Sequence, residues 1–197
     1  MVKVKQVRSD NTSNKILEAA CKIFPELGFA GTSISMLAKD AKINQSLIYH
    51  HFGSKEELWK ATKGYLLRDV FDAGHDDSHS LDDFVRDSVR TRFDWYLKHP
   101  EVIRMVNWQR LEPKRKQLQG TSPMSVDSWV KIIPRMQKDG KIRADLPAEM
   151  IIVMMGNIII APMLDEHRFL QSRESCEKYI AVITEALLFV LKPSVIA

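Results

Sequence analysis

The sequence predicts an all-α protein of about nine helices, with a small N-terminal domain and a larger helical C-terminal domain. Apolar residues recur at helical spacing along nearly the whole chain, and no stretch shows the period-two alternation of a half-buried strand. Capping residues, prolines or glycines bound most of these segments. With 197 residues, of which 45% are hydrophobic and 27% charged, the chain can bury a substantial core.

The first helix is expected between Thr12, a suitable N-cap, and Gly28, which suits the position just beyond a helix C-terminus. Pro25 removes one backbone hydrogen bond and is expected to bend the last turn. The apolar residues of this segment that share one helical face are Ile16, Ala20, Ile23, Phe24 and Leu27.

Two short helices follow. One starts at Thr32 or Ser33, and the other is capped by Asn44 and runs to about His51 with Leu47 directed inward. The residues expected to be buried in the first of the two are Ile34, Leu37, Ala38 and Ala41. Two helices of about two turns with a short break between them form a helix-turn-helix, in which the second helix fits the DNA major groove.

The fourth helix begins with a capping box formed by Ser54 and Glu57, and it is expected to extend to about Ala73. Ser80 caps a fifth helix that ends at His99. The remaining helices are expected at 100–111, from Ser122–Pro123 to Gly140 with a kink at Pro134, from Asp145–Pro147 to Leu164, and at 173–191. The domain boundary is expected near the fourth helix, which gives domains 1–63 and 64–197.

Basic charge is concentrated near the N-terminus. Residues 1–63 hold ten Lys/Arg and six Asp/Glu, whereas residues 64–197 hold nineteen of each. The formal net charge of +4 therefore belongs to the first third of the chain, which suggests a polyanionic partner such as nucleic acid.

The cysteines and the apolar runs predict a cytoplasmic protein that does not contact a membrane. Cys21 and Cys176 are far apart and have no neighbouring cysteine, so neither a disulfide framework nor a zinc site is expected. The first thirteen residues lack the apolar region of a signal peptide. The longest uncharged run, 150–164, is shorter than the roughly 20 residues of a membrane-spanning helix and is interpreted as a buried helix.

Three motifs between Ile16 and Trp59 stand in register over about 45 residues. They are the ILEAA-x-x-x-F opening, the G-F-x-x-T-S-I entry to the second helix, and the L-x-Y-x-H-F-x-S-K-E-x-L ending. This stretch closely resembles the N-terminal domain of the TetR family of transcriptional regulators. The resemblance implies a DNA-binding helix-turn-helix at about 33–52, a homodimer, and a C-terminal domain that holds an inducer.

The turn departs from the family pattern. It usually reads Ala-Gly in the family, but here it reads Ala41-Lys42, and Pro25 stands where the family often has Ala. A lysine is unfavourable where φ is positive, so the turn is expected to be strained or differently shaped.

The exposed face of the helix-turn-helix supplies the predicted DNA contacts. The residues expected to contact DNA are Thr32, Ser33, Lys42, Asn44, Gln45, Ser46, Tyr49, His50 and Lys55. Hydroxyls and amides at a helix start can hold a phosphate, and lysines can pair with the DNA backbone. The resemblance implies phosphate contacts for Tyr49 and Lys55, and base reading for the face that carries Gln45. For Tyr49 and His50, packing or a solvated surface is the alternative.

Aromatic and methionine side chains in the C-terminal part suggest an adaptable apolar cavity, although the same side chains also suit an ordinary core. The candidate ligand-binding residues are Trp95, Met105, Trp108, Trp129, Met154 and Met155. The predicted ligand is a small, largely apolar inducer, and the predicted dimer pairs the last two helices with those of a second copy. The candidate dimer-interface residues are Tyr179, Val182, Ile183, Ala186, Leu187 and Val190.

Other functions receive less support. The sequence has no nucleophile elbow and no glycine-rich phosphate loop, so neither an enzyme nor a cofactor is expected. His75 and His79 have a metal-capable spacing, but they and the basic cluster 114–116 are interpreted as solvated loops. A regulator that answers a protein partner, acts without a ligand, or activates transcription remains the alternative to a ligand-released repressor.

Overall fold

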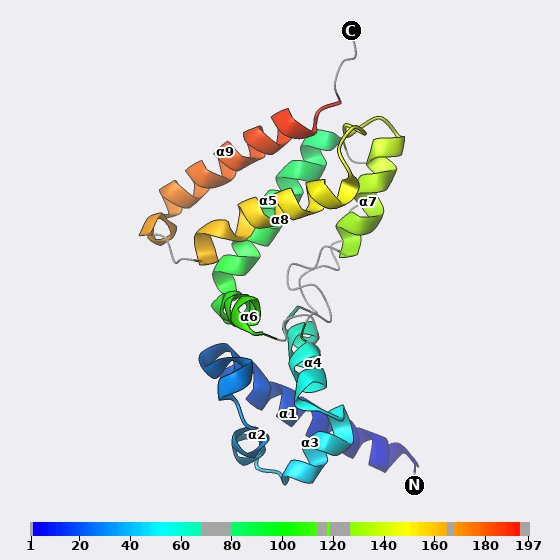
Figure 1. The fold of residues 1–197 in the computed structure, drawn as a ribbon, viewed down its shortest axis with the longest axis vertical. Coiled ribbons are helices and arrows are strands. Elements are labelled where there is room, and N and C mark those ends of the chain that lie inside the picture. The colour runs from blue at the N-terminus through cyan, green and yellow to red at the C-terminus, as the bar shows by residue number, and fades with distance from the viewer. Residues whose placement is uncertain (1, 68–79, 114–117, 119–126, 165–167, 194–197) are drawn as a thin grey trace. The chain divides into compact units, whose positions relative to one another are not determined.

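The computed structural model describes residues 2–67, 80–113, 118, 127–164 and 168–193. These residues form nine α-helices and one short 3-10 helix, and no strand occurs among them, which confirms the predicted fold class (Figure 1). The chain divides into two compact units, of which the first contains Met1–Asp69 and Glu101–Pro123, and the second contains Val70–Pro100 and Met124–Ala197. The sequence predicted a single boundary after residue 63, whereas Glu101–Pro123 belongs to the first unit together with the N-terminal residues.

The helices of the first unit are α1 (Val2–Gly31), α2 (Ile34–Asp40), α3 (Gln45–Phe52), α4 (Lys55–Leu67) and α6 (Pro100–Leu111). The expected start of the first helix at Thr12 is wrong, because α1 already begins at Val2. Gly28, with φ 70° and ψ −179°, interrupts α1 in a conformation that side chains other than glycine rarely adopt. The glycine therefore breaks the regular helix where the sequence predicted its end.

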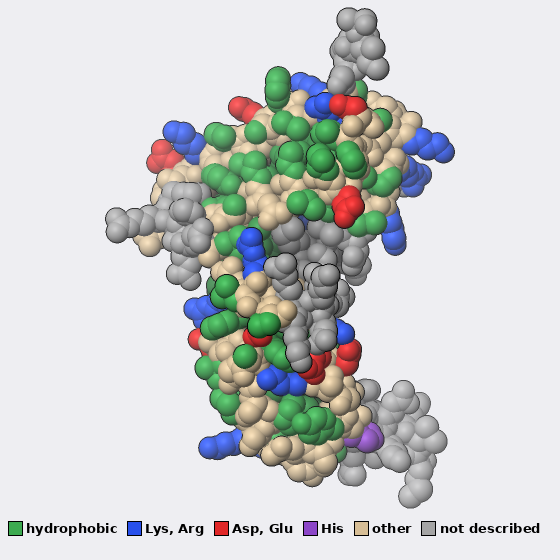
Figure 2. All heavy atoms as spheres, in the orientation of Figure 1, with side chains coloured by type: hydrophobic (Ala, Val, Ile, Leu, Met, Phe, Trp, Pro, Cys, Tyr) green, Lys and Arg blue, Asp and Glu red, His purple; other side chains and the backbone are tan. Residues whose placement is uncertain are grey.

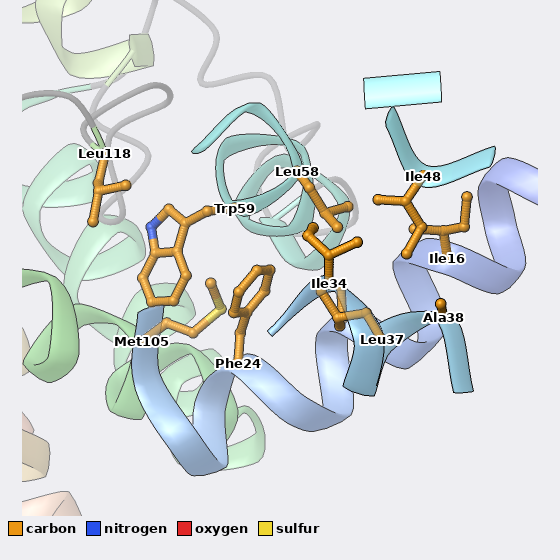
Figure 3. Close-up of a cluster of buried hydrophobic side chains, with 11 residues drawn as sticks. Ile16, Phe24, Ile34, Leu37, Ala38, Ile48, Leu58, Trp59, Met105 and Leu118 are labelled. Atoms are coloured by element: carbon orange, nitrogen blue, oxygen red, sulfur yellow. The ribbon is translucent and has the colours of Figure 1, made fainter. Parts of the chain in front are cut away.

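The core of the first unit is formed by α1, α2, α3 and α4 together with Met105 of α6 and Leu118 (Figure 3). Trp59 lies at its centre with no exposed surface and meets the ring of Phe24 edge-on at 4.9 Å between centroids. On α3, Ile48 is the fully buried residue, whereas the predicted inward residue Leu47 is only half-buried.

The helices of the second unit are α5 (Leu81–Lys98), α7 (Asp127–Lys138), α8 (Ala148–Leu164) and α9 (Arg173–Leu191), with the 3-10 helix η1 at Arg168–Gln171. The cap at Ser80 is confirmed, since its Oγ accepts a hydrogen bond of 3.1 Å from the amide of Asp83. Gly140 ends the α7 segment with φ 68°, as predicted. The expected extension of α4 to Ala73 and the expected helix start at Ser122 lie outside the described residues, as do His75, His79 and the cluster 114–116.

Within the second unit, α5 packs against both α8 and α9, and α7 packs against α8 (Figure 1). Large apolar side chains such as Phe84, Phe93, Ile159 and Leu187 are almost completely buried between these helices. Burial of this kind is the main favourable contribution to folding. Among the helices described, none is both long and apolar enough to cross a membrane.

Candidate DNA-binding site

The turn between α2 and α3 is closed by a Schellman motif. The amide of Ile43 donates to the carbonyl of Ala38 at 3.0 Å, and the amide of Lys42 donates to that of Lys39 at 3.2 Å. Lys42 has φ 55°, and it is the single non-glycine residue with positive φ in the described part of the chain. A lysine thus holds the left-handed conformation that the sequence predicted to be unfavourable, and the turn keeps the hydrogen bonding of a glycine-type helix end.

The N-cap predicted at Asn44 is present, and Ser33, one of the two residues predicted to start the first short helix, caps α2. Ser33 Oγ accepts from the amide of Met36 at 3.1 Å, and Asn44 Oδ1 accepts from the amide of Leu47 at 3.1 Å. Asn44 Oδ1 also accepts a 2.5 Å hydrogen bond from the hydroxyl of Ser46. These contacts satisfy amides at the two helix starts, and both cap side chains remain exposed.

The recognition surface is the exposed side of α3, opposite the buried Ile48. Gln45, Ser46 and His50 are exposed, and Tyr49 keeps 50% of its surface accessible. The structure therefore brings these predicted residues together on one helix face, next to the exposed Lys42 at the turn. Amide, hydroxyl and imidazole groups on such a face have the donors and acceptors that read base edges in the major groove.

Thr32 does not belong to this surface. Only 2% of Thr32 is exposed, and its hydroxyl donates to the carbonyl of Gly28 at 2.7 Å. The hydroxyl therefore satisfies a backbone carbonyl beside the interruption of α1, and the predicted phosphate contact of this side chain is corrected.

Lys55 also makes contacts inside the first unit. Its Nζ donates to the carbonyl of Thr32 at 2.6 Å and lies 4.3 Å from the centre of the Phe29 ring. Burial lowers the pKa of Lys55, and the carboxylates of Glu56 and Glu112 offset part of this decrease. Lys55 thus links the start of α4 to the junction between α1 and α2, and a contact to phosphate stays a prediction.

One of the two hydrogen bonds of the predicted capping box is present at the start of α4. The amide of Glu57 donates to Ser54 Oγ at 3.1 Å, as predicted. The Glu57 carboxylate, however, accepts from Lys60 Nζ at 2.7 Å instead of reaching back to the cap.

Helix α6 is attached to α1 by three side-chain contacts, one of them made by Trp108, which was predicted to line a ligand pocket. The indole N–H of Trp108 donates to the carbonyl of Pro25 at 3.0 Å, and its ring covers Gly28. Arg104 pairs with Glu26, and Glu112 Oε1 accepts from the amide of Ala30 at 3.0 Å. Trp108 is therefore a packing residue of the first unit, which explains why this unit includes α6.

Met105 is likewise part of the first unit. It is 1% exposed within the core around Trp59 and borders a cavity of about 10 Å³ between α4 and α6. A space of that size holds about one water molecule and no larger ligand. Met105 therefore packs in the core of the first unit, and a larger ligand pocket that includes Met105 or Trp108 stays a prediction.

A buried lysine links α4 to α6. Lys63, with 3% of its surface exposed, donates from Nζ to Gln109 Oε1 at 2.6 Å and to the carbonyl of Leu118 at 2.7 Å. Burial lowers the pKa of Lys63 to about 8, and the charge of Lys60 adds to this effect. No sequence signal distinguished Lys63 from the solvated lysines around it.

The other candidate ligand residues lie in the second unit. Trp129 and Met155 are fully buried, whereas Trp95 and Met154 are half-buried. Trp95 stacks on His99 at 4.3 Å between ring centroids. Trp129 adjoins buried polar groups, since its indole N–H donates to Ser88 Oγ at 3.3 Å and the Arg92 guanidinium lies over its ring.

The candidate dimer residues divide between two sides of α9. Ile183 and Leu187 are 3% and 1% exposed, so they belong to the chain's own core and are corrected as interface residues. Val182, at 56%, and Ala186 are exposed, while Tyr179 and Val190 are half-buried. The sequence analysis also missed Phe189, which is 82% exposed on the same side as Val182.

Two family models match this chain, one near its N-terminus and one over its C-terminal part. Residues 16–62 match the model of the bacterial regulatory proteins of the tetR family, and residues 85–186 match that of the tetracyclin repressor-like C-terminal domain. The transcriptional repressor NicS of Pseudomonas putida is 28% identical over 79% of this chain and 77% of its own length. The repressor AcnR of Corynebacterium efficiens is 25% identical over 76% of this chain and 78% of its own length.

The fold agrees with these matches. The crystal structure of a TetR family transcriptional regulator from Pseudomonas syringae pv. tomato superimposes with a TM-score of 0.70 over 89% of this chain and 94% of that chain, at 19% sequence identity. Because one family model alone spans residues 85–186 and a second covers the helix-turn-helix, the chain belongs to the TetR family and is a DNA-binding transcriptional regulator.

Proposed function

We propose that this regulator represses transcription by binding a palindromic operator as a homodimer, and that a small ligand with a largely apolar body releases it. The observation that supports operator binding best is the exposed face of α3, where Gln45, Ser46, Tyr49 and His50 project from a helix anchored by Ile48. Two copies of such a helix related by a two-fold axis read two inverted half-sites.

The dimer is supported by an apolar face on α8 and α9. Figure 2 shows hydrophobic side chains gathered over this side of the second unit. Met150 and Val153 of α8 are 55% and 54% exposed, and Val182 and Phe189 of α9 are 56% and 82% exposed. Large exposed apolar patches on a protein usually mark an interaction surface. A second copy that presents the same helices would cover it with a self-complementary four-helix contact.

Selection of bound DNA from a random pool tests this function. The wild-type protein should enrich sites with inverted symmetry, and Gln45→Ala should lose preference at one position of each half-site, at a cost of roughly 1–3 kcal/mol. Gln171→Ala, which removes an exposed glutamine in the second unit, is the matched control and should select the wild-type site. Enriched sites without inverted symmetry would contradict the dimer-on-operator proposal.

A regulator that answers a protein partner is the second candidate. The same exposed apolar face on α8 and α9 favours it if the face binds another protein instead of a second copy. Sedimentation of the purified protein separates the two, because a homodimer forms without any partner. Transcription measured in vitro from a promoter that carries the selected site separates repression from activation.

A further inference from the structure

The exposed side of α9 carries two opposite charges among its apolar residues. Val182 and Phe189 are exposed there, and Lys178 and Glu185 are exposed on the same helix. These four residues follow one another at intervals of four, three and four positions, which places them on one helix face. The ammonium group therefore lies about one turn before Val182, and the carboxylate lies about one turn after it.

The chain itself does not pair these two charges. Among the described residues, none forms a hydrogen bond or an ion pair with the side chain of Lys178 or Glu185. Arg86 of α5 interacts electrostatically with Glu185, but its guanidinium is paired with Asp82. Lys178 and Glu185 are also about 10 Å apart along the helix axis, which is too far for a contact between them.

The apolar part of this face continues on α8. The Tyr179 hydroxyl donates to the carbonyl of Ile158 at 2.6 Å, so α8 and α9 lie side by side here (Figure 1). Met150 and Val153 are exposed on α8, and residues 150–164 include no charged side chain. A purely apolar occupant would leave both charges of α9 covered without a partner, which is costly. The occupant that fits best has an anion opposite Lys178 and a cation opposite Glu185.

Helix α9 of a second copy has this pattern. A two-fold axis at right angles to the helix turns the second α9 antiparallel to the first. When the axis crosses α9 midway between residues 178 and 185, Lys178 faces the partner's Glu185 and Glu185 faces the partner's Lys178. Val182 then lies next to the axis, between the two ion pairs. A parallel pair of helices in register would instead bring like charges together.

We propose that a second copy of this chain covers the face with its α9 antiparallel, and that Lys178 of each subunit pairs with Glu185 of the partner subunit. The proposal rests on the homodimer proposed above and adds its register and the residues that restrict each subunit to its own kind. The two ion pairs select against other chains, because a regulator without opposite charges at both positions leaves at least one charge unpaired or beside a like charge.

Charge reversal tests the register. In Lys178→Glu, two carboxylates face each other on both sides of the axis, and in Glu185→Lys two ammonium groups do. Sedimentation of the full chain at low salt should give a dimer Kd about tenfold or more above the wild-type value for each variant. The double variant restores opposite charges at both places, so its Kd should return to within about threefold of wild type. In about 1 M salt the differences should shrink, because charges are then screened within about 3 Å.

A mixture of the two single variants separates a contact between subunits from an effect inside each chain. A heterodimer of Lys178→Glu with Glu185→Lys joins one carboxylate and one ammonium group at both places. The equimolar mixture should therefore form a heterodimer with roughly the wild-type Kd, although each variant alone dimerises poorly. A defect in folding or in the packing of one chain would persist in the mixture.

Lys131→Glu is the matched control, because Lys131 is an exposed lysine on α7. It should keep the wild-type Kd, and circular dichroism should show wild-type helix content in every variant. An unchanged Kd in both reversals, a double variant as weak as the single ones, or a mixture no tighter than its components overturns the register and leaves a homodimer standing. A wild-type protein that is monomeric at micromolar concentration contradicts the homodimer itself, and the face would then belong to another protein.

Discussion

At the scale of single residues, Gly28 and Lys63 determine how the first unit holds together. Gly28 lets the Trp108 ring pack directly on the backbone of α1, because a Cβ at this position would lie 2.7 Å from Trp108 Cδ2. Lys63 places an ammonium group among apolar side chains and directs it to Gln109 and the carbonyl of Leu118. Both residues join α6 or the segment after it to the helices that carry the DNA-binding site.

Gly28→Ala is expected to destabilise the protein by about 2–4 kcal/mol, since it adds backbone strain at φ 70° to a steric clash with Trp108. Urea unfolding measures the change. Gly64→Ala is the control, because a Cβ at Gly64 of α4 meets nothing within 4 Å and the residue is helical. That variant should gain about 0.5–1 kcal/mol, and an equal loss in both variants would contradict the packing role of Gly28.

Lys63 predicts a pH dependence of stability. Its pKa in the folded protein is about 8, below its ordinary value of 10.5, so between these pH values the unfolded chain binds more protons than the folded one. The free energy of unfolding should therefore rise with pH across this window, by about 1–3 kcal/mol. Lys63→Met should lose the rise, as measured by urea unfolding at pH 7.5 and pH 9.5.

The control for this pH dependence is Lys22→Met. The Lys22 side chain is 72% exposed, so its removal should leave the pH dependence of unfolding as in the wild-type protein. If Lys63→Met keeps the full increase, another group causes it.

At the scale of secondary-structure elements, α9 has two different apolar sides. One carries Ile180, Ile183 and Leu187 into the core of the second unit. The other carries Val182, Ala186 and Phe189 on the surface, at spacings of four and three residues. A helix that is apolar around most of its circumference is expected to be buried on more than one side, and the chain itself buries only the first.

Phe189→Glu is expected to give a folded monomer with greatly weakened operator binding, because it places a charge in the proposed interface. Sedimentation velocity at micromolar concentration and circular dichroism measure both properties. Val130→Glu is the control, since Val130 is a similarly exposed apolar residue, at 54%, on a different helix, α7. Ile183→Arg should instead unfold the second unit, because Ile183 is buried. A Phe189→Glu variant that remains a dimer would place the interface elsewhere.

At the scale of the whole molecule, the uneven charge along the chain predicts how DNA affinity responds to salt. The net positive charge belongs to residues 1–63, which include the helix-turn-helix, while residues 64–197 are neutral overall. Phosphate contacts release condensed counterions, so operator affinity should fall linearly with the logarithm of salt concentration.

Lys42→Gln should decrease the slope of this salt dependence by about one unit per protomer, because Lys42 is exposed at the turn beside the recognition surface. Fluorescence anisotropy with a labelled operator between 50 and 200 mM salt is a suitable measurement for such slopes. Lys131→Gln, which removes an exposed lysine of α7, should keep the wild-type slope. An unchanged slope in Lys42→Gln would remove this residue from the phosphate contacts.

The sequence by itself determined the helical class, the cap at Asn44, and the exposed face of α3. These features depend on local periodicity and on hydrogen bonds between residues a few positions apart, which the sequence order directly shows. The full extent of α1 was missed because residues before Thr12 lack an apolar stripe.

Only the tertiary structure decided which long-range partners these residues have. Trp108 was expected in a pocket but packs on Gly28, 80 positions earlier, and Lys63 bonds to Gln109, 46 positions later. Arg92 belongs to a helix rich in charged residues, and only the structure shows that its side chain is 2% exposed and stacked on Trp129 of α7. Periodicity identifies the face of a helix that packs, but which helix covers that face depends on the packing of segments distant in sequence.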